Sequence, residues 1–97
     1  MRIAFSPRFL LDLQEIADYI AVDNPARAFS FAQEIRDKCL SLSDAPESGV
    51  RRDDYGFGIR VVPFRRYVIF YIIYPDRLRI ERILHSARHF PAMFDDR

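Results

Sequence analysis

Residues 67–74 read Tyr-Val-Ile-Phe-Tyr-Ile-Ile-Tyr, and this run decides the fold of the chain. Every residue in it is β-branched or aromatic, which favours an extended backbone. Because successive side chains of a strand point to opposite faces, the run presents apolar groups on both sides. It therefore predicts a central strand that is covered, at least in part, on each face.

A turn and a further strand follow this run. Pro75-Asp76-Arg77 predicts the turn, and residues 78–85, Leu-Arg-Ile-Glu-Arg-Ile-Leu-His, predict the strand. The alternation of apolar and polar residues holds at Leu78 and Ile80, and then Arg82 stands where an apolar residue is expected. Either a bulge shifts the register there, or Arg82 lies on a face that is not simple core.

The segment before the central run predicts two helices. Ser6 and Asn24 are suitable N-caps, and each is followed by a proline that suits the first helical position. In the first helix Phe9, Leu13, Ile16 and Ile20 form one apolar face, and we expect Asp12, Glu15 and Asp18 to point elsewhere. The second apolar stripe consists of Ala28, Phe31, Ala32, Ile35, Cys39 and Leu42. The short connection predicts an antiparallel helical hairpin.

The order of elements predicts one α+β domain over residues 1–97, with the order β-α-α-β-β-β. Ile3-Ala4-Phe5 is the first strand, residues 44–49 are a loop, residues 51–58 are charged and exposed, and strands resume at Ile59. We expect an antiparallel sheet of about four strands with the hairpin on one face. Nothing in so short a chain is left to cover the other face, and a half-open apolar face invites a partner.

Charge is distributed unevenly along the chain. Residues 1–50 hold five basic and eight acidic residues, whereas residues 51–97 hold ten arginines and six acidic residues. An arginine-rich half indicates an anionic partner, either nucleic acid or an acidic protein segment. The alternative is a general preference for arginine in the composition.

Other features bear on location and on cysteine chemistry. No apolar run approaches the roughly 20 residues of a membrane span, and residues 1–7 do not resemble a signal peptide. A single cysteine, Cys39, forms no internal disulfide, and its place in the helical stripe predicts a buried apolar role. We therefore expect a cytoplasmic protein without a membrane partner.

Two segments of the chain together form a specific pattern. The first is Asp12-Leu13-Gln14-Glu15-Ile16-Ala17-Asp18-Tyr19-Ile20-Ala21 with the junction Asp23-Asn24-Pro25. The second runs from Gly58-Ile59-Arg60 through the central strand to His85-Ser86-Ala87-Arg88. Together they resemble the RelE/ParE toxin superfamily, over residues 3 to about 90. The order of an arginine, a Tyr-led apolar strand, a turn and an Arg-rich strand ending in His-small-Ala-Arg resembles its ParE branch. Ser86 stands where that branch often has glycine, and His89 stands where an acidic residue is common.

The resemblance implies that the chain is the toxin of a type II toxin–antitoxin system, neutralised by a ParD-like antitoxin that covers part of its surface. ParE-branch toxins act on DNA gyrase, and we expect that target here. The alternative, implied by the RelE branch, is a ribosome-dependent endoribonuclease that cleaves messenger RNA.

The nuclease alternative assigns four residues to catalysis. His85 is the candidate acid or base, and Arg60, Arg82 and Arg88 are the candidate phosphate clamp. Glu81 is the single glutamate placed as a possible base. ParE-like chains carry the histidine and the last arginine without being known as nucleases, so we expect a binding protein rather than an enzyme.

We expect no cofactor, no metal site and no direct nucleic-acid specificity for the toxin alone. His85 and His89 lie four residues apart, but a strand ends between them and no third ligand accompanies them. We expect the rings of Tyr67, Tyr71 and Tyr74 to lie in the core of the protein rather than to stack on nucleic-acid bases. The candidates for binding gyrase or antitoxin are Arg60, Arg65, Arg66, Arg82, His85, Arg88, His89 and Phe94.

Overall fold

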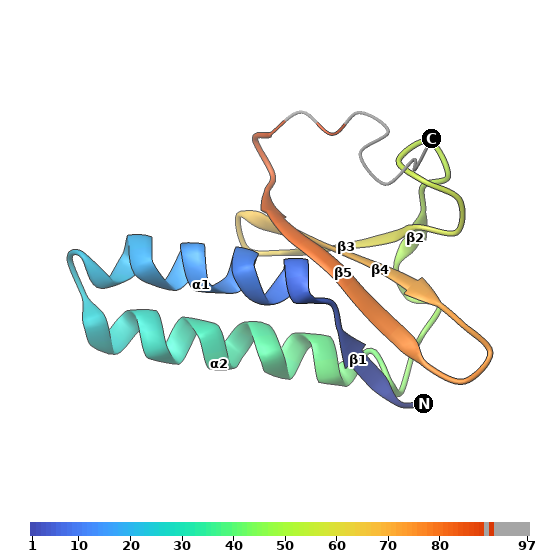
Figure 1. Cartoon of the computed structure of the whole chain (residues 1–97), viewed down its shortest axis with the longest axis horizontal. Coiled ribbons are helices and arrows are strands. Elements are labelled where there is room, and N and C mark those ends of the chain that lie inside the picture. The colour runs from blue at the N-terminus through green and yellow to red at the C-terminus, as the bar shows by residue number, and fades with distance from the viewer. Residues whose placement is uncertain (89, 91–97) are drawn as a thin grey trace.

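The computed structural model describes residues 1–88 and 90, and it confirms the predicted α+β class and the predicted order of the long elements (Figure 1). The elements are β1 (Ile3–Phe5), α1 (Pro7–Ala21), α2 (Pro25–Ser41), β2 (Val50–Arg51), β3 (Arg60–Phe64), β4 (Tyr67–Ile73) and β5 (Leu78–His85). In the described part of the chain, neither helix is long and apolar enough to cross a membrane.

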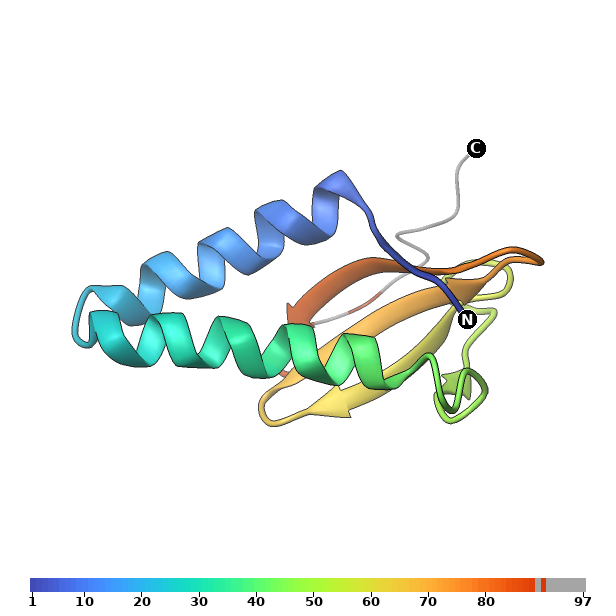
Figure 2. The ribbon, with the colours of Figure 1, turned by 90° about the horizontal axis from the view of Figure 1, so that it is seen from below.

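Both helices begin where the sequence predicts. The hydroxyl oxygen of Ser6 accepts a hydrogen bond from the amide of Phe9 at 2.9 Å, and the side chain of Asn24 accepts one from the amide of Arg27 at 3.0 Å. These caps satisfy amides that lack a partner within the helix. The helices form the predicted antiparallel hairpin, and its tip extends well beyond the turn between β3 and β4 (Figures 1 and 2).

The sheet differs from the prediction in two details. It has five strands in the order β1-β5-β4-β3-β2, because the two residues of β2 pair with β3 at the edge. It is also mixed rather than wholly antiparallel, because β1 runs parallel to β5. A parallel pair requires a long crossover connection, and the helical hairpin with the three intervening strands provides it. Such a pairing between the two ends of a chain has no local sequence signal.

The bulge considered for β5 is present. Phe70 pairs with Arg82 and the next residue, Tyr71, pairs with Ile80, so Glu81 is the extra residue on β5. The bulge allows Ile83 to return to the same core as Ile80, despite the break in simple alternation.

The main core lies between the hairpin and the sheet. It contains the buried side chains of Phe9, Phe31, Ile35, Cys39, Leu42, Val62, Ile69, Tyr71, Leu78, Ile80 and Ile83. The predicted stripes of both helices therefore face the sheet. Tyr71 is fully buried, and its hydroxyl donates to the carbonyl of Pro46 at 2.6 Å and accepts from the amide of Gly49 at 2.9 Å. These bonds hold the loop after α2 against the central strand.

The second face of the sheet is not left uncovered, and the prediction of a half-open apolar face is wrong at its centre. Ile59, Phe70 and Leu84 form a second buried cluster there. The ring of Tyr55 packs edge-on against Phe70 at 5.9 Å, and that of Phe90 does so at 5.1 Å. Residues 51–58, predicted as a charged and exposed stretch, thus bring one aromatic ring, that of Tyr55, onto the sheet.

Candidate functional site

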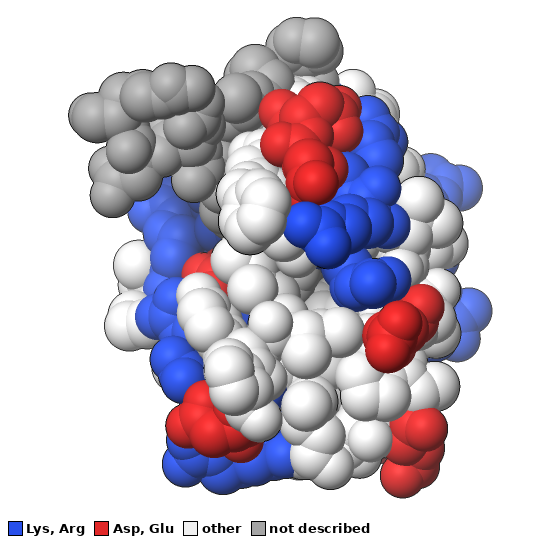
Figure 3. Space-filling model, turned by 90° about the vertical axis from the view of Figure 1, so that its right-hand side faces the viewer, with Lys and Arg blue, Asp and Glu red and all other residues white. Residues whose placement is uncertain are grey.

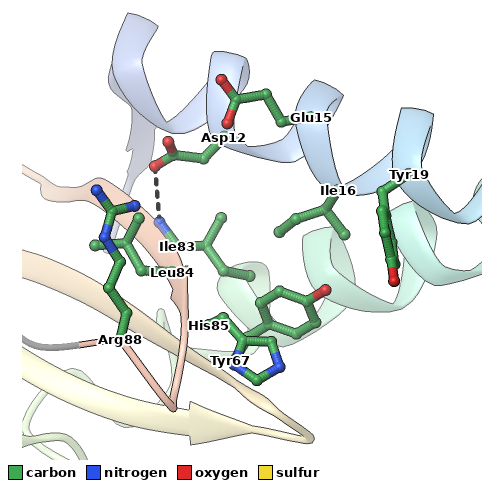
Figure 4. Close-up of a pocket in the computed structure, with 9 residues that line it drawn as sticks. All are labelled: Asp12, Glu15, Ile16, Tyr19, Tyr67, Ile83, Leu84, His85 and Arg88. Carbon is green, nitrogen blue, oxygen red and sulfur yellow. Dashed lines mark hydrogen bonds between the residues drawn. The ribbon is translucent and has the colours of Figure 1, made fainter.

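A pocket of about 180 Å³ opens between α1 and the end of β5 (Figure 4). We call it the α1–β5 pocket; it is lined by Asp12, Glu15, Ile16, Tyr19, Tyr67, Ile83, Leu84, His85 and Arg88. Asp12, Glu15 and Tyr19 come from α1, whereas His85 and Arg88 come from the end of β5 and the turn after it (Figure 4). The pocket therefore joins acidic and aromatic groups of the hairpin to basic groups of the sheet.

Asp12 forms one wall of this pocket, and its predicted outward orientation is wrong. Its side chain is 3% exposed and accepts two hydrogen bonds from the guanidinium of Arg82, at 2.7 and 2.9 Å. The amide of Ile83 also donates to it at 3.2 Å (Figure 4). Arg82, a predicted catalytic or binding residue, is thus engaged within the protein, with a side chain 13% exposed.

His85 and Tyr67 lie at the mouth of the pocket. They pair across β5 and β4, and their rings meet edge-on with centroids 5.3 Å apart. The Nδ1 atom of His85 accepts a hydrogen bond from the amide of Ala87, and its carbonyl accepts one from the amide of Arg88. This turn keeps the exposed His85 and Arg88 on the same side of the strand end. Burial raises the pKa of Tyr67, and the nearby Tyr19 adds to the effect.

A second hollow of about 280 Å³ adjoins the first and shares Tyr67 with it. We call it the Tyr67 groove; it is lined by Ile20, Arg27, Phe31, Arg65, Arg66 and Tyr67. Arg65 has a positive φ of 56° in the tight turn between β3 and β4, and its guanidinium reaches Glu34 of α2 at 3.2 Å. The groove is therefore an apolar recess whose rim carries exposed arginines.

Glu34 balances part of this positive charge. Arg27 donates to it at 2.6 Å, and this hydrogen bond lowers the pKa of Glu34, while the charge of Arg65 adds to the effect. Arg66, in contrast, is exposed at the same turn next to Tyr67. Large apolar side chains near the hairpin tip are also exposed, with Tyr19 at 78%, Val22 at 82% and Phe29 at 71%.

Arg60 lies elsewhere. It pairs with Tyr71, whereas His85 pairs with Tyr67, so the two are separated by four residues along β4, or about 13 Å in strand direction. Its guanidinium donates to the carbonyl of Gly49 at 2.9 Å and lines a different pocket. The four residues of the nuclease hypothesis are therefore not gathered in one place.

The predicted site residues fall into three groups. Arg65, Arg66, His85 and Arg88 come together around Tyr67, while Arg82 is engaged by Asp12 and Arg60 is at the other end of the sheet. His89 and Phe94 lie outside the described residues. In residues 1–88 and 90, no three His, Cys, Asp or Glu side chains gather as a metal site would require.

Comparison with known proteins identifies the family. The family model described as the ParE toxin of the type II toxin–antitoxin system parDE matches residues 3–90. The chain belongs to the ParE toxin family. Its structure is similar to a solved chain of the chromosomal ParDE toxin–antitoxin system from P. aeruginosa, at 20% identity and a TM-score of 0.77. That similarity covers 88% of this chain and 95% of the other, and at this identity it shows a shared fold. The curated proteins contain no match.

This ParE-family chain is thus the toxin of a type II toxin–antitoxin pair, as the resemblance implied. The sequence pattern did not predict Asp12, Glu15 and Tyr19 as residues of the site. Asp12 had a usable signal, because it follows Phe9 by three residues and precedes Ile16 by four, which puts it on the helical face that meets the sheet. The pairing of Asp12 with Arg82, in contrast, had no signal in the local sequence.

Proposed function

We propose that this toxin inhibits DNA gyrase through the surface around Tyr67, and that a ParD-like antitoxin neutralises it by competing for that surface. Membership of the ParE family is the observation that carries the proposal. Gyrase is a cytoplasmic enzyme, so the proposal also implies a cytoplasmic location.

The chemistry of the surface supports binding to another protein. The α1–β5 pocket and the Tyr67 groove together present Arg65, Arg66, His85 and Arg88 beside a recess and exposed apolar side chains of the hairpin. Arginine and aromatic side chains are enriched at the centres of protein interfaces, because they combine a large apolar contact with directed hydrogen bonds.

The same geometry speaks against the endoribonuclease alternative. Cleavage requires an acid or base and a phosphate clamp within reach of one scissile bond. Arg60 is about 13 Å from His85 in strand direction, and Arg82 is held by the carboxylate of Asp12. Of the four catalytic candidates, only His85 and Arg88 therefore line the same pocket with side chains that are not held by a carboxylate of the described residues.

The test is DNA supercoiling by purified gyrase with and without the toxin, with linear cleaved DNA scored on the same gel. We expect loss of supercoiling together with accumulation of linear product. Preincubation with the cognate antitoxin restores supercoiling if the antitoxin competes for the same surface. No effect at a large excess of folded toxin contradicts the proposal, and cleavage of messenger RNA on programmed ribosomes then favours the alternative.

Variants connect the activity to the surface. Arg66→Ala and Arg88→Ala remove exposed cations beside Tyr67, and each is expected to raise the toxin concentration for half-inhibition about tenfold. The matched control is Arg36→Ala, because Arg36 is an exposed arginine of α2 that packs over Phe5 instead. Equal potency of all three variants contradicts the assignment of this surface, even where gyrase inhibition itself is observed.

A further inference from the structure

A third hollow, at about 570 Å³, is larger than the α1–β5 pocket and the Tyr67 groove, and it lies at the end of the sheet opposite His85. We call it the Arg60 pocket; it is lined by Glu47, Arg51, Phe57, Gly58, Arg60, Ile72, Ile73 and Tyr74. Its volume is within the range of roughly 300 to 1,000 Å³ that is typical of small-molecule sites. The proposed gyrase-binding surface does not use it.

Arg60 gives this pocket a fixed positive charge. Its guanidinium donates to the backbone carbonyls of Gly49 at 2.9 Å and Glu47 at 3.4 Å, and its side chain is 20% exposed. The carboxylate of Glu47 is 3.9 Å away on a side chain that is 84% exposed, so solvent screens that ion pair. Carbonyl oxygens orient the guanidinium without cancelling its charge. Arg82, in contrast, is neutralised by a buried carboxylate at 2.7 Å.

Two aromatic residues, Phe57 and Tyr74, line the same pocket as Arg60. Phe57 is 86% exposed, and the guanidinium of Arg51 lies 5.2 Å from its ring centre. Tyr74 has the guanidinium of Arg77 at 4.5 Å. Asp53 holds Arg51 in place through a 2.8 Å ion pair, which raises the pKa of Arg51. An exposed ring with a cation on one side is a platform on which a further planar group can stack.

The rest of the Arg60 pocket is also suited to a planar group that carries negative charge. Ile72 and Ile73 provide an apolar wall of the pocket, and Gly58, at φ +80°, contributes backbone without a side chain. Figure 3 faces this end of the sheet and shows basic side chains gathered beside uncharged surface, with acidic side chains in contact with some of them. Because the net charge of the whole chain is only +1, general attraction of polyanions is weak, and binding here depends on the local geometry.

We propose that the Arg60 pocket binds a nucleotide unit, with its phosphate on Arg60 and its base stacked against Phe57. A guanidinium donates two parallel hydrogen bonds to a phosphate, and an exposed aromatic ring stacks any base. The unit is either a free mononucleotide or part of a single strand, since the bases of a duplex are already stacked. Contacts of this kind do not read sequence, in agreement with the expected lack of nucleic-acid specificity. This inference does not depend on gyrase inhibition.

The test uses the purified toxin alone at low ionic strength, where charge contacts are least screened. Fluorescence anisotropy follows a labelled single-stranded oligo(dT), with dTMP, thymidine, duplex DNA and an acidic aromatic peptide as competitors. We expect saturable binding of oligo(dT) and competition by dTMP but not by thymidine, which lacks the phosphate. Competition by dTMP at concentrations similar to those of the oligonucleotide indicates a mononucleotide site, and much weaker competition indicates a strand site.

Variants separate the pocket from general charge effects. Arg60→Gln and Phe57→Ala are each expected to weaken oligo(dT) binding about tenfold, through the lost phosphate contact and the lost stacking respectively. Glu47→Gln removes an acidic group at the rim and is expected to strengthen binding severalfold. Arg36→Gln, which removes the same charge on α2, is expected to change binding less than twofold. Phe57 and Glu47 are exposed, so their variants remain informative if Arg60→Gln unfolds.

Three outcomes overturn the inference. One is the absence of saturable binding by both oligo(dT) and dTMP. Another is equal weakening by Arg36→Gln and Arg60→Gln, which indicates attraction by net charge. The last is displacement of the oligonucleotide by the acidic peptide at much lower concentration than by dTMP, which assigns the pocket to a polypeptide partner.

Discussion

Asp12 on α1 and Arg82 on β5 form a doubly hydrogen-bonded ion pair between residues 70 positions apart in the chain. The carboxylate also accepts the amide of Ile83. β1 pairs with β5 as far as Ile80, and Asp12 satisfies an amide of β5 beyond the point where β1 ends. The ion pair therefore fastens the first helix to a strand edge that would otherwise present an unpaired amide.

Removing one partner of this ion pair is expected to be costly. Asp12→Ala leaves a largely buried guanidinium and a buried amide without their acceptor, and we expect a loss of about 3–5 kcal/mol of unfolding free energy. Urea denaturation followed by circular dichroism measures the loss. Glu15→Ala, an exposed carboxylate of the same helix, serves as control and is expected to change stability by less than about 0.5 kcal/mol.

The double variant Asp12→Leu/Arg82→Leu tests the cause. Because it removes both charges, we expect it to be more stable than Asp12→Ala, although it still lacks the acceptor for the amide of Ile83. If the double variant is as unstable as the sum of two single variants, then the uncompensated charge is not the source of the loss.

Gly49 is expected to tolerate no side chain. A Cβ atom there lies 2.6 Å from the hydroxyl oxygen of Tyr71 and 2.9 Å from the carbonyl oxygen of Val61. Tyr71 is fully buried and bonded on both sides of its hydroxyl, so it has no room to move away. We expect Gly49→Ala to cost about 3 kcal/mol, as measured by thermal or urea unfolding.

Gly58 provides the contrast, because its constraint is conformational rather than steric. The nearest atom to a Cβ there is 3.8 Å away on Ile72, but the φ angle is +80°. We expect Gly58→Ala to cost about 1 kcal/mol and Gly58→Asn less, since asparagine adopts the left-handed region more readily. Equal losses for the alanine variants of the two glycines contradict the distinction.

Glu34 makes the stability of the folded protein depend on pH. Its pKa in the folded protein is lowered from 4.5 by the hydrogen bond from Arg27, and the positive charge of Arg65 adds to this. A carboxyl whose folded pKa is depressed stabilises the protein above its unfolded pKa, and the contribution is lost as the pH falls through the folded pKa. We expect wild type to exceed Glu34→Gln in stability equally at pH 7 and pH 6, and the difference to shrink steadily below pH 4.5.

Chemical unfolding at pH 7, 6, 4 and 3 measures that difference. The pH dependence of wild-type stability alone does not isolate Glu34, because the pKa values of Asp53 and Asp54 are also lowered by arginine partners. Comparison with the variant isolates the contribution of Glu34. A difference that stays constant down to pH 3 contradicts the assigned role of Arg27 and Arg65.

Cys39 is expected to report on unfolding. It is fully buried, and burial raises the pKa of its thiol to about 12. At pH 8 the thiol is thus both protonated and inaccessible, and we expect no reaction with a disulfide reagent until the chain unfolds. Labelling is measured by absorbance with and without urea, and the destabilised variant Asp12→Ala is expected to react faster. Rapid labelling of folded wild type contradicts the burial of Cys39.

The sequence predicted the local elements well. The caps at Ser6 and Asn24, the apolar stripes of the helices and the central strand all depend on neighbours within a few residues, and the structure confirms each of them. His85 and Arg88 were also recognised together, because they lie only three residues apart in the chain, at and just after the end of β5. In all these cases, spacing and backbone preference carry the information.

The tertiary structure alone decided the contacts between distant segments. No local signal predicts the ion pair between Asp12 and Arg82, the parallel pairing of β1 with β5, the covering of the second face by Tyr55 and Phe90, or the separation of Arg60 from His85. Each depends on which distant segments the packed core brings together. The sequence by itself therefore determined the elements and the family, because these follow from short-range pattern and motif order, whereas packing decided which side chains share a site.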